Sequence, residues 1–167
     1  NDNFKDFWKF SPSANIWTPK AEFGGTPRRE AVGFSLGTKG YIGTGKGAVY
    51  KTDFWEYDPE NNNWTNKADC GGTGRSEAVG FSIVNYAYIG TGIIYEFENA
   101  YRKDFWEYNP ANDIWIQKAD FNGTARQFAV GFSIDTKGYL GTGQQSNGYL
   151  KDFWEYDAAS DSWSQKA

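Results

Sequence analysis

The 167-residue sequence contains no histidine and no methionine, and its only cysteine is Cys70. Histidine is the commonest metal ligand and a frequent general base, so its absence excludes His-based catalytic triads and His-ligated zinc or copper. A single cysteine excludes an intrachain disulfide, and we expect Cys70 to be a small apolar plug. Because even position 1 is not methionine, we expect a processed product or a piece of a longer chain.

The sequence also lacks long apolar runs and an excess of positive charge. No segment approaches the roughly 20 consecutive apolar residues of a transmembrane helix. The net charge of −4 gives no basic surface for nucleic acid. Only 39% of the residues are hydrophobic, but 19% are aromatic, and each large ring buries roughly 150–250 Å². We therefore expect an aromatic core, no membrane span and no nucleic-acid partner.

An Asp-Phe-Trp tripeptide occurs four times, and a second tryptophan always follows nine residues after the first. The pairs are Trp8/Trp17, Trp55/Trp64, Trp106/Trp115 and Trp154/Trp163, which use all eight tryptophans. A fixed period of about 20–50 residues indicates one supersecondary unit that is copied and stacked. The spacing divides the chain into a half unit at 1–21 and complete units at 22–68, 69–119 and 120–167.

Each complete unit predicts four short strands. The first alternates large and small residues, at 30–36, 77–83 and 128–134. After a tight turn, the second ends in Gly-Thr-Gly, at 41–45, 88–92 and 139–143. The Asp-Phe-Trp element forms the third, and the second tryptophan lies in the fourth. The units differ in length mainly between the second and third strands, where insertions map to loops on one face, often the binding face.

These features resemble the kelch repeat, in the form found in bacterial proteins of the galactose-oxidase-like type. The match includes Trp-x-Tyr-Asp-Pro-x-x-x-x-Trp from Trp55 to Trp64, although the usual glycine pair is split as Gly-Thr-Gly. The resemblance implies an all-β fold in which each unit is a four-stranded antiparallel blade of a β-propeller. It also implies secretion, with an extracellular or cell-surface location.

Propellers close with about four to eight blades, whereas this chain supplies three blades and one hairpin, which is half or part of a propeller. Three arrangements stay open: the remainder of a longer propeller, a six-blade ring of two copies, or a head-to-tail filament. We favour a homo-oligomer, because open sheet faces and strand edges are association surfaces. The N-terminal hairpin is then expected to dock on a sheet of another copy.

One arginine precedes the first strand of every complete unit. The three are Arg28, Arg75 and Arg126. In kelch adaptors, arginines at the matching position point into the mouth of the central channel and bind acidic peptides, so the resemblance implies a ligand-binding mouth here. The alternative is that each arginine binds loop carbonyls or the next blade. Glu30 and Glu77 could neutralise the first two arginines, and Phe128 in the third unit would leave Arg126 freer.

The insertion at 93–102 is the longest and the most aromatic. Its candidate contacts with protein or sugar are Tyr95, Phe97, Tyr101 and Arg102. The alternative is a loop that folds onto its own blade or onto a subunit contact. The aspartates of the Asp-Phe-Trp elements recur in every unit, so we expect them to be structural. The Asx-rich turns lack the ligand pattern of a calcium loop, and we predict no metal and no cofactor.

The predicted function is a non-enzymatic propeller module for protein–protein association, with self-assembly first. Galactose oxidase, an enzyme of this fold, uses copper held by histidines and tyrosines, and that activity cannot be transferred to a chain without histidine. The alternative is a carbohydrate-binding or carbohydrate-active extracellular propeller that uses Glu30, Glu77 and the 95–101 region. A glycosidase needs two carboxylates about 5–9.5 Å apart, and fold alone does not establish function.

Overall fold

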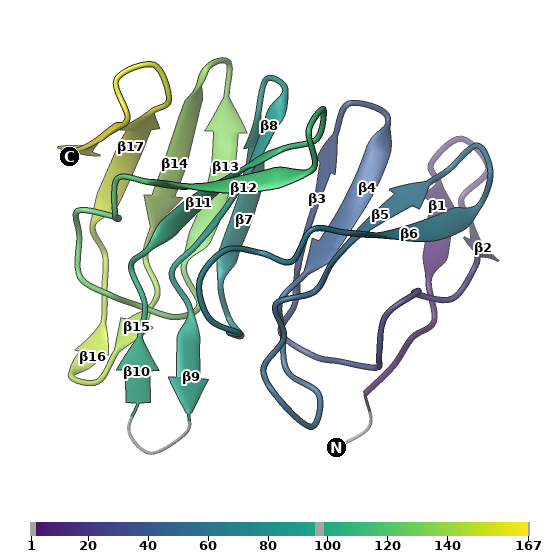
Figure 1. The fold of residues 1–167 in the computed structure, drawn as a ribbon, viewed down its shortest axis with the longest axis horizontal. Helices are drawn as coiled ribbons and strands as arrows, with labels where there is room; N and C mark the ends of the chain where they lie inside the picture. Colours follow the sequence, from purple (N-terminus) through teal and green to yellow (C-terminus); the bar gives the residue numbers. More distant parts are fainter. Residues whose placement is uncertain (1–2, 96–98, 167) are drawn as a thin grey trace.

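The computed structural model describes residues 3–95 and 99–166. Within these ranges every regular element is a β-strand. No helix capable of crossing a membrane is present in this part of the chain. Three four-stranded antiparallel sheets stand side by side, and a two-stranded hairpin lies at one end (Figure 1). The predicted all-β class is confirmed.

The three sheets share one strand order, in which each strand pairs with the next one of its unit. Sheet 1 contains β3 (Val32–Leu36), β4 (Lys39–Gly43), β5 (Phe54–Asp58) and β6 (Asn63–Lys67). Sheet 2 contains β7 (Val79–Ile83), β8 (Tyr86–Gly90), β11 (Phe105–Asn109) and β12 (Ile114–Lys118). Sheet 3 contains β13 (Val130–Ile134), β14 (Lys137–Gly141), β17 (Phe153–Asp157) and β18 (Ser162–Lys166).

Three small hairpins complete the fold. The N-terminal hairpin pairs β1 (Trp8–Ser11) with β2 (Ile16–Pro19). The insertions of sheets 2 and 3 form the other two, which project from the same side of the molecule (Figure 1). They are β9 (Ile93–Tyr95) with β10 (Asn99–Tyr101), and β15 (Gln144–Gln145) with β16 (Gly148–Tyr149).

The first strand of each sheet begins two residues later than the sequence predicts. Glu30, Glu77 and Phe128 have φ angles of 57°, 58° and 54°, and this left-handed conformation cannot continue a β-strand. The three left-handed residues are two glutamates and a phenylalanine. No shared residue type in the sequence therefore marks this conformation. The predicted starts at these positions are therefore two residues too early.

The second strands begin two residues earlier than predicted and end earlier as well. In sheet 1 the turn has only two residues, because Leu36 pairs directly with Lys39. The strand ends at Gly43, since Thr44 is left-handed (φ 58°) and Gly45 follows with φ 90°. Glycine adopts such a φ without steric cost. The Gly-Thr-Gly motif is thus the exit from the strand rather than part of it.

Adjacent elements interlock through a repeated aromatic contact, in which a phenylalanine of one element lies against a tyrosine and a tryptophan of the next. The sets are Phe7 with Tyr57 and Trp64, Phe54 with Tyr108 and Trp115, and Phe105 with Tyr156 and Trp163. All six ring-centroid distances lie between 4.8 and 5.0 Å. Edge-to-face pairs of this kind stabilise beyond their buried area by about 0.5–1.5 kcal/mol each.

Cys70 lies between sheets 1 and 2 at the position that Phe23 and Phe121 occupy in the other units. Its side chain is buried, and burial raises the pKa of the thiol to about 12. A thiol with such a pKa is not a nucleophile at neutral pH. The expected role as an apolar plug is confirmed.

The N-terminal hairpin packs with one face on the chain's own sheet 1, and its docking on a sheet of another copy stays a prediction. Phe7 enters the aromatic contact described above, and the Ala21 amide donates to Asn62 Oδ1, in the turn between β5 and β6, at 3.0 Å. The Phe23 amide donates to the Lys5 carbonyl at 2.8 Å. The hairpin therefore occupies the place of a third and fourth strand preceding sheet 1.

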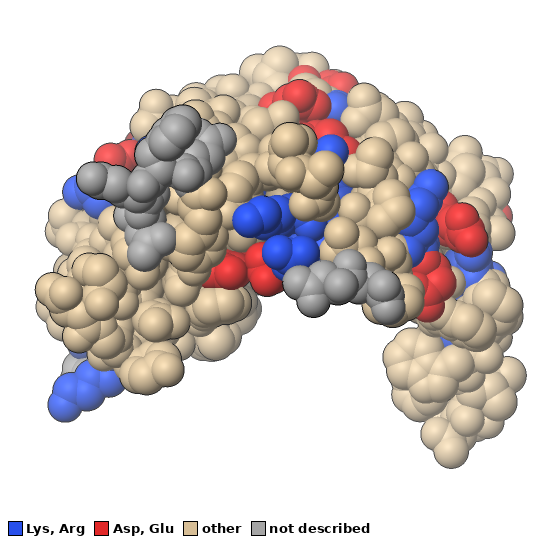
Figure 2. Space-filling model, turned by 90° about the horizontal axis from the view of Figure 1, so that it is seen from below, with Lys and Arg blue, Asp and Glu red and all other residues tan. Residues whose placement is uncertain are grey.

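Seen from the side of the small hairpins, the molecule is an arch around an open hollow (Figure 2). Acidic and basic side chains gather along the inner edge of the arch (Figure 2). The first strands β3, β7 and β13 are neighbours along this edge. The charged groups make this concave edge the candidate site.

Candidate functional site

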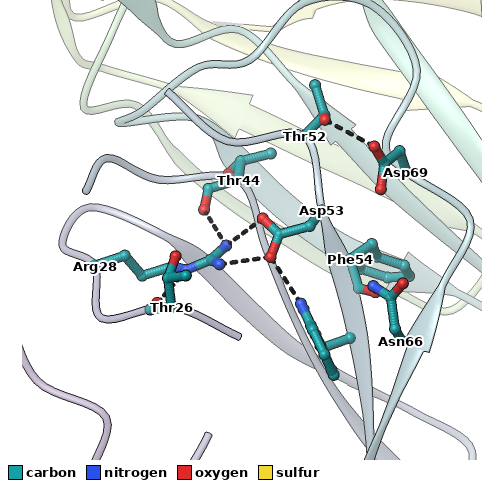
Figure 3. A network of polar contacts seen from close by, with 9 residues as sticks. Thr26, Arg28, Thr44, Thr52, Asp53, Phe54, Asn66 and Asp69 are labelled. Carbon is teal, nitrogen blue, oxygen red and sulfur yellow. Dashed lines mark hydrogen bonds and ion pairs between the residues drawn. The ribbon is translucent and has the colours of Figure 1, made fainter. Parts of the chain in front are cut away.

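Every sheet contains one buried cluster of an arginine, an aspartate and a tryptophan, here called the Arg–Asp–Trp cluster. In sheet 1, Arg28 Nη1 donates to Asp53 Oδ1 at 2.7 Å and Nη2 donates to Oδ2 at 2.6 Å (Figure 3). The Trp55 indole N–H donates to the same Oδ2 at 2.8 Å. The guanidinium also donates to the carbonyl oxygens of Thr26 and Thr44, at 3.1 and 2.9 Å (Figure 3).

The same geometry recurs in the other two sheets. The equivalent clusters are Arg75–Asp104–Trp106 and Arg126–Asp152–Trp154. Burial alone would raise the pKa of Asp53, but hydrogen bonds from Arg28 and Trp55 hold it below its usual value. A forked, charge-assisted pair of this kind is strong and geometrically specific. Each cluster joins the segment before the first strand, which carries the arginine, to the segment before the third strand, which carries the aspartate.

The three arginines are not free for a ligand. Arg75 and Arg126 are fully buried and Arg28 is 9% exposed, and each guanidinium already donates four hydrogen bonds to its own sheet. The structure therefore matches the alternative, in which the arginines hold loop carbonyls. The expectation that Arg126 is freer is wrong, because Asp152 rather than a glutamate is its partner.

The three left-handed residues line the inner edge of the arch. Glu30, Glu77 and Phe128, each with the alanine that follows it, line a cavity of about 300 Å³. Their backbones are joined, since the Glu77 amide donates to the Glu30 carbonyl and the Phe128 amide donates to the Glu77 carbonyl, both at 3.1 Å. A residue in this conformation costs about 1–3 kcal/mol. Because the same conformation recurs in the three sheets, the three residues line the same cavity.

Glu77 has the most unusual chemistry in this cavity. Its side chain is 9% exposed, and its Oε2 has no hydrogen-bond partner among the described atoms. Burial, followed by the charge of Glu30, raises the pKa of Glu77 to about 7. Near neutral pH the two carboxyl groups can therefore offer one proton donor together with acceptors. Such a pair is suited to hydroxyl groups or amines.

A second polar network lies beside this cavity and joins the predicted contact Tyr95 to three residues that the sequence did not single out. Lys46 Nζ donates to Tyr50 Oη at 3.0 Å and lies over the Tyr50 ring, 4.5 Å from its centroid. Tyr50 Oη also accepts from the Tyr95 amide at 2.9 Å, and Tyr95 Oη donates to Gln127 Oε1 at 2.7 Å. Tyr95 was predicted as a contact, whereas Lys46, Tyr50 and Gln127 were not, because no repeated motif marks them.

The remaining predicted contacts fall elsewhere. Tyr101 and Arg102 line a different cavity, of about 350 Å³, together with Lys103, Asp104 and residues of the 72–73 loop. The structure therefore does not place them in the cavity lined by Glu30 and Glu77. Phe97 lies outside the described residues. Within residues 3–95 and 99–166, no group of three metal-ligating side chains is present.

Comparison with known proteins supports the fold and leaves the activity open. No protein-family model matches the sequence, and no curated protein matches it. Among solved structures, that of YjhT matches with a TM-score of 0.84 at 18% sequence identity. The match covers 98% of this chain and 59% of YjhT, so the chain spans less than two thirds of that protein. The chain has a β-propeller-type fold built from four-stranded antiparallel sheets.

Proposed function

We propose that the chain is a non-enzymatic, kelch-type propeller module whose open sheet faces bind other polypeptides, and first of all other copies of itself. The module works outside the cell or at its surface, as the resemblance to secreted bacterial kelch proteins suggests. The observation that carries the proposal is that the apolar side of one first strand is buried, whereas the equivalent side of another is exposed. It concerns the first strands of sheets 2 and 3.

The apolar side of β7 is covered, whereas the same side of β13 is open. Val79, Phe81 and Ile83 are 3–4% exposed, because sheet 3 packs on them. Their counterparts Val130, Phe132 and Ile134 are 59, 41 and 55% exposed. Fully burying one such side chain contributes about 1.5–3 kcal/mol, so covering the three half-exposed ones contributes about 3 kcal/mol.

The opposite end of the arch offers a complementary surface on the N-terminal hairpin. The rings of Phe10 and Trp17 lie 5.0 Å apart, tilted by 37°, and both are exposed. The covered pair Tyr57 and Trp64 has nearly the same arrangement, 5.0 Å and 43°, and receives Phe7. Phe153 at the open end of one copy can therefore meet this pair in the next copy. Such a contact is head to tail.

Light scattering on the purified chain tests the proposal over a range of concentrations. We expect a mass of at least twice 18.8 kDa at high concentration, and Val130→Asp should reduce association by placing a charge in the contact. Val49→Asp is the matched control, because Val49 is exposed to a similar extent (61%) but lies in a loop of sheet 1. A mass of 18.8 kDa at every concentration would contradict self-association.

A second candidate function is binding of a carbohydrate in the cavity of Glu30 and Glu77. The unpartnered Oε2 of Glu77 favours it, since sugar hydroxyl groups supply both donors and acceptors. Glycan-array binding should then be lost in Glu77→Gln and Tyr95→Phe. Tyr101→Ala serves as the control, because Tyr101 lines the other cavity. Binding that survives both changes would remove this candidate.

A further inference from the structure

Sheet 2 lacks an ion pair that both other sheets have at the same place. In sheets 1 and 3 a lysine at the start of the second strand pairs with an aspartate at the end of the third. The pairs are Lys39 with Asp58 and Lys137 with Asp157, each with a nitrogen–oxygen distance of 2.7 Å. Sheet 2 has Tyr86 and Asn109 at these positions. Both members of the pair are thus replaced together by uncharged residues.

The turn that leads into Tyr86 is strained. Val84 stands where sheet 1 has Gly37 and sheet 3 has Asp135, and its φ of 53° is an outlier for a β-branched residue. Its side chain is 64% exposed and that of Tyr86 is 39% exposed, so burial in the core does not explain the conformation. Backbone strain of this kind is found preferentially at functional sites.

Tyr86 and Asn109 line a groove between sheets 1 and 2, with a volume of about 590 Å³. It lies at the ends of the sheets opposite the small hairpins (Figure 1). None of the described residues that line it is charged. The equivalent groove between sheets 2 and 3 has charged lining residues, which are Glu107, Lys137 and Asp157. Both walls of the uncharged groove belong to complete four-stranded sheets, so it does not depend on the open ends of the arch.

The polar groups of this groove are available to a ligand. Asn109 Oδ1 accepts from the Ala111 amide at 3.0 Å, and its Nδ2 makes no hydrogen bond to the described residues. The side-chain amide of Asn85 and the hydroxyl of Tyr86 make none either within this part of the chain. The other tyrosine of the groove, Tyr41, is 4% exposed and donates to Glu56 at 2.6 Å. The groove therefore offers one open ring beside two free amide groups.

We propose that the groove between sheets 1 and 2 binds a neutral oligosaccharide. The Tyr86 ring packs against the apolar C–H face of a sugar ring, and the amides of Asn85 and Asn109 bond to hydroxyl groups, which both donate and accept. An acidic or basic ligand would find no opposite charge here. A proline-rich peptide needs a groove lined by several aromatic rings, whereas Tyr86 alone exposes its ring among the described lining residues.

This site is separate from the exposed face of β13 and from the cavity of Glu30 and Glu77. It goes beyond both candidate functions, because neither the residues nor the end of the sheets is shared with them. Binding in the groove therefore does not require self-association.

The test probes the full chain with an array of neutral, acidic and amino-group-bearing oligosaccharides, followed by titration calorimetry with the neutral ones that bind. The double substitution Tyr86→Lys with Asn109→Asp installs the residues that sheets 1 and 3 have here, so it should fold with about the same Tm. We expect it to weaken binding by about tenfold or more, because it removes the ring and one amide. Tyr86→Phe keeps the ring and should keep most of the affinity.

The matched control is Tyr149→Lys, the same substitution at a tyrosine that is 88% exposed in β16. It should bind as the parent does, and so should Glu77→Gln, which separates this site from the other cavity. An array on which no neutral oligosaccharide binds overturns the proposal, as does binding that survives the double substitution. Proline-rich peptides on the same array are the rival ligand, and their binding in place of the sugars would also overturn it. Light scattering decides self-association independently.

Discussion

Strands β7 and β13 have the same sequence, Val-Gly-Phe-Ser-Ile, and opposite surroundings. Both pair with the following strand in the same antiparallel register, yet Phe81 is 4% exposed and Phe132 is 41% exposed. Because the five residues are identical, their sequence cannot be the cause of this difference. Sheet 3 covers β7, and nothing among the described residues covers that side of β13. Strand formation therefore depends on the local sequence, whereas the burial of the side chains depends on whether a neighbouring sheet covers them.

The largest difference in stability is expected between substitutions of Asp104, whose partner Arg75 is fully buried, and of Asp6 in the N-terminal hairpin. Asp104→Asn leaves the fully buried Arg75 without its carboxylate, which should lower the free energy of unfolding by about 3–5 kcal/mol. Asp6→Asn, the same change in the hairpin, should cost less than about 0.5 kcal/mol because no arginine among the described residues pairs with Asp6. Urea denaturation measures both. Equal losses would show that the two aspartates have equivalent surroundings.

The identical strands provide the next test. Phe81→Ala should cost about 3–4 kcal/mol, because it leaves a cavity between sheets 2 and 3. Phe132→Ala should cost about 1 kcal/mol or less when measured at a concentration at which the chain is a monomer. Thermal unfolding of the two variants gives the comparison. A large loss in Phe132→Ala at that concentration would mean that β13 is covered in the monomer.

The pH dependence distinguishes the covered Glu77 from the more exposed Glu30. Burial and the Glu30 charge raise the pKa of Glu77 to about 7, so the folded state binds a proton that the unfolded state releases near pH 4.5. This stabilisation is complete below that pH, and it is lost as the pH rises towards 7. It amounts to at most about 3 kcal/mol.

Glu77→Gln should remove this fall in stability, so that the variant is more stable than the parent at pH 8 and about equal to it at pH 5. Urea denaturation at the two pH values measures the effect. Glu60→Gln, in an exposed turn, is the control and should leave the pH profile unchanged. A parent chain with the same stability at pH 5 and pH 8 would contradict the assignment.

The smallest effect is expected from a single methyl group. A Cβ at Gly131 would lie 2.3 Å from Val79 Cγ1, so Gly131→Ala should cost about 1–3 kcal/mol through overpacking. Gly33→Ala should be neutral or slightly stabilising, because its nearest atom would be 3.8 Å away and alanine reduces the entropy of the unfolded chain. Differential scanning calorimetry resolves such a pair. A costly Gly33→Ala would show that the side of β3 that carries Gly33 is already covered.

The repeat made the number of sheets and the position of most strands predictable, since Asp-Phe-Trp and the second tryptophan mark the third and fourth strands of each unit. The boundaries of the first strands were missed, because the left-handed residues Glu30, Glu77 and Phe128 do not share one residue type. The partner of each arginine was missed as well. Arg28 and Asp53 recur together in every complete unit, but variable loops separate such pairs by 25, 29 and 26 residues.

The sequence alone determined which residues form strands, where the turns lie and which aromatic residues repeat. These properties depend on backbone stereochemistry and on side-chain alternation over a few residues. The tertiary structure decided which arginine meets which aspartate, which copy of Val-Gly-Phe-Ser-Ile is buried, and where the hairpin β1–β2 docks. Those outcomes depend on groups that are distant along the chain, and the free energy of a buried charge or ring is set by whatever lies beside it in space.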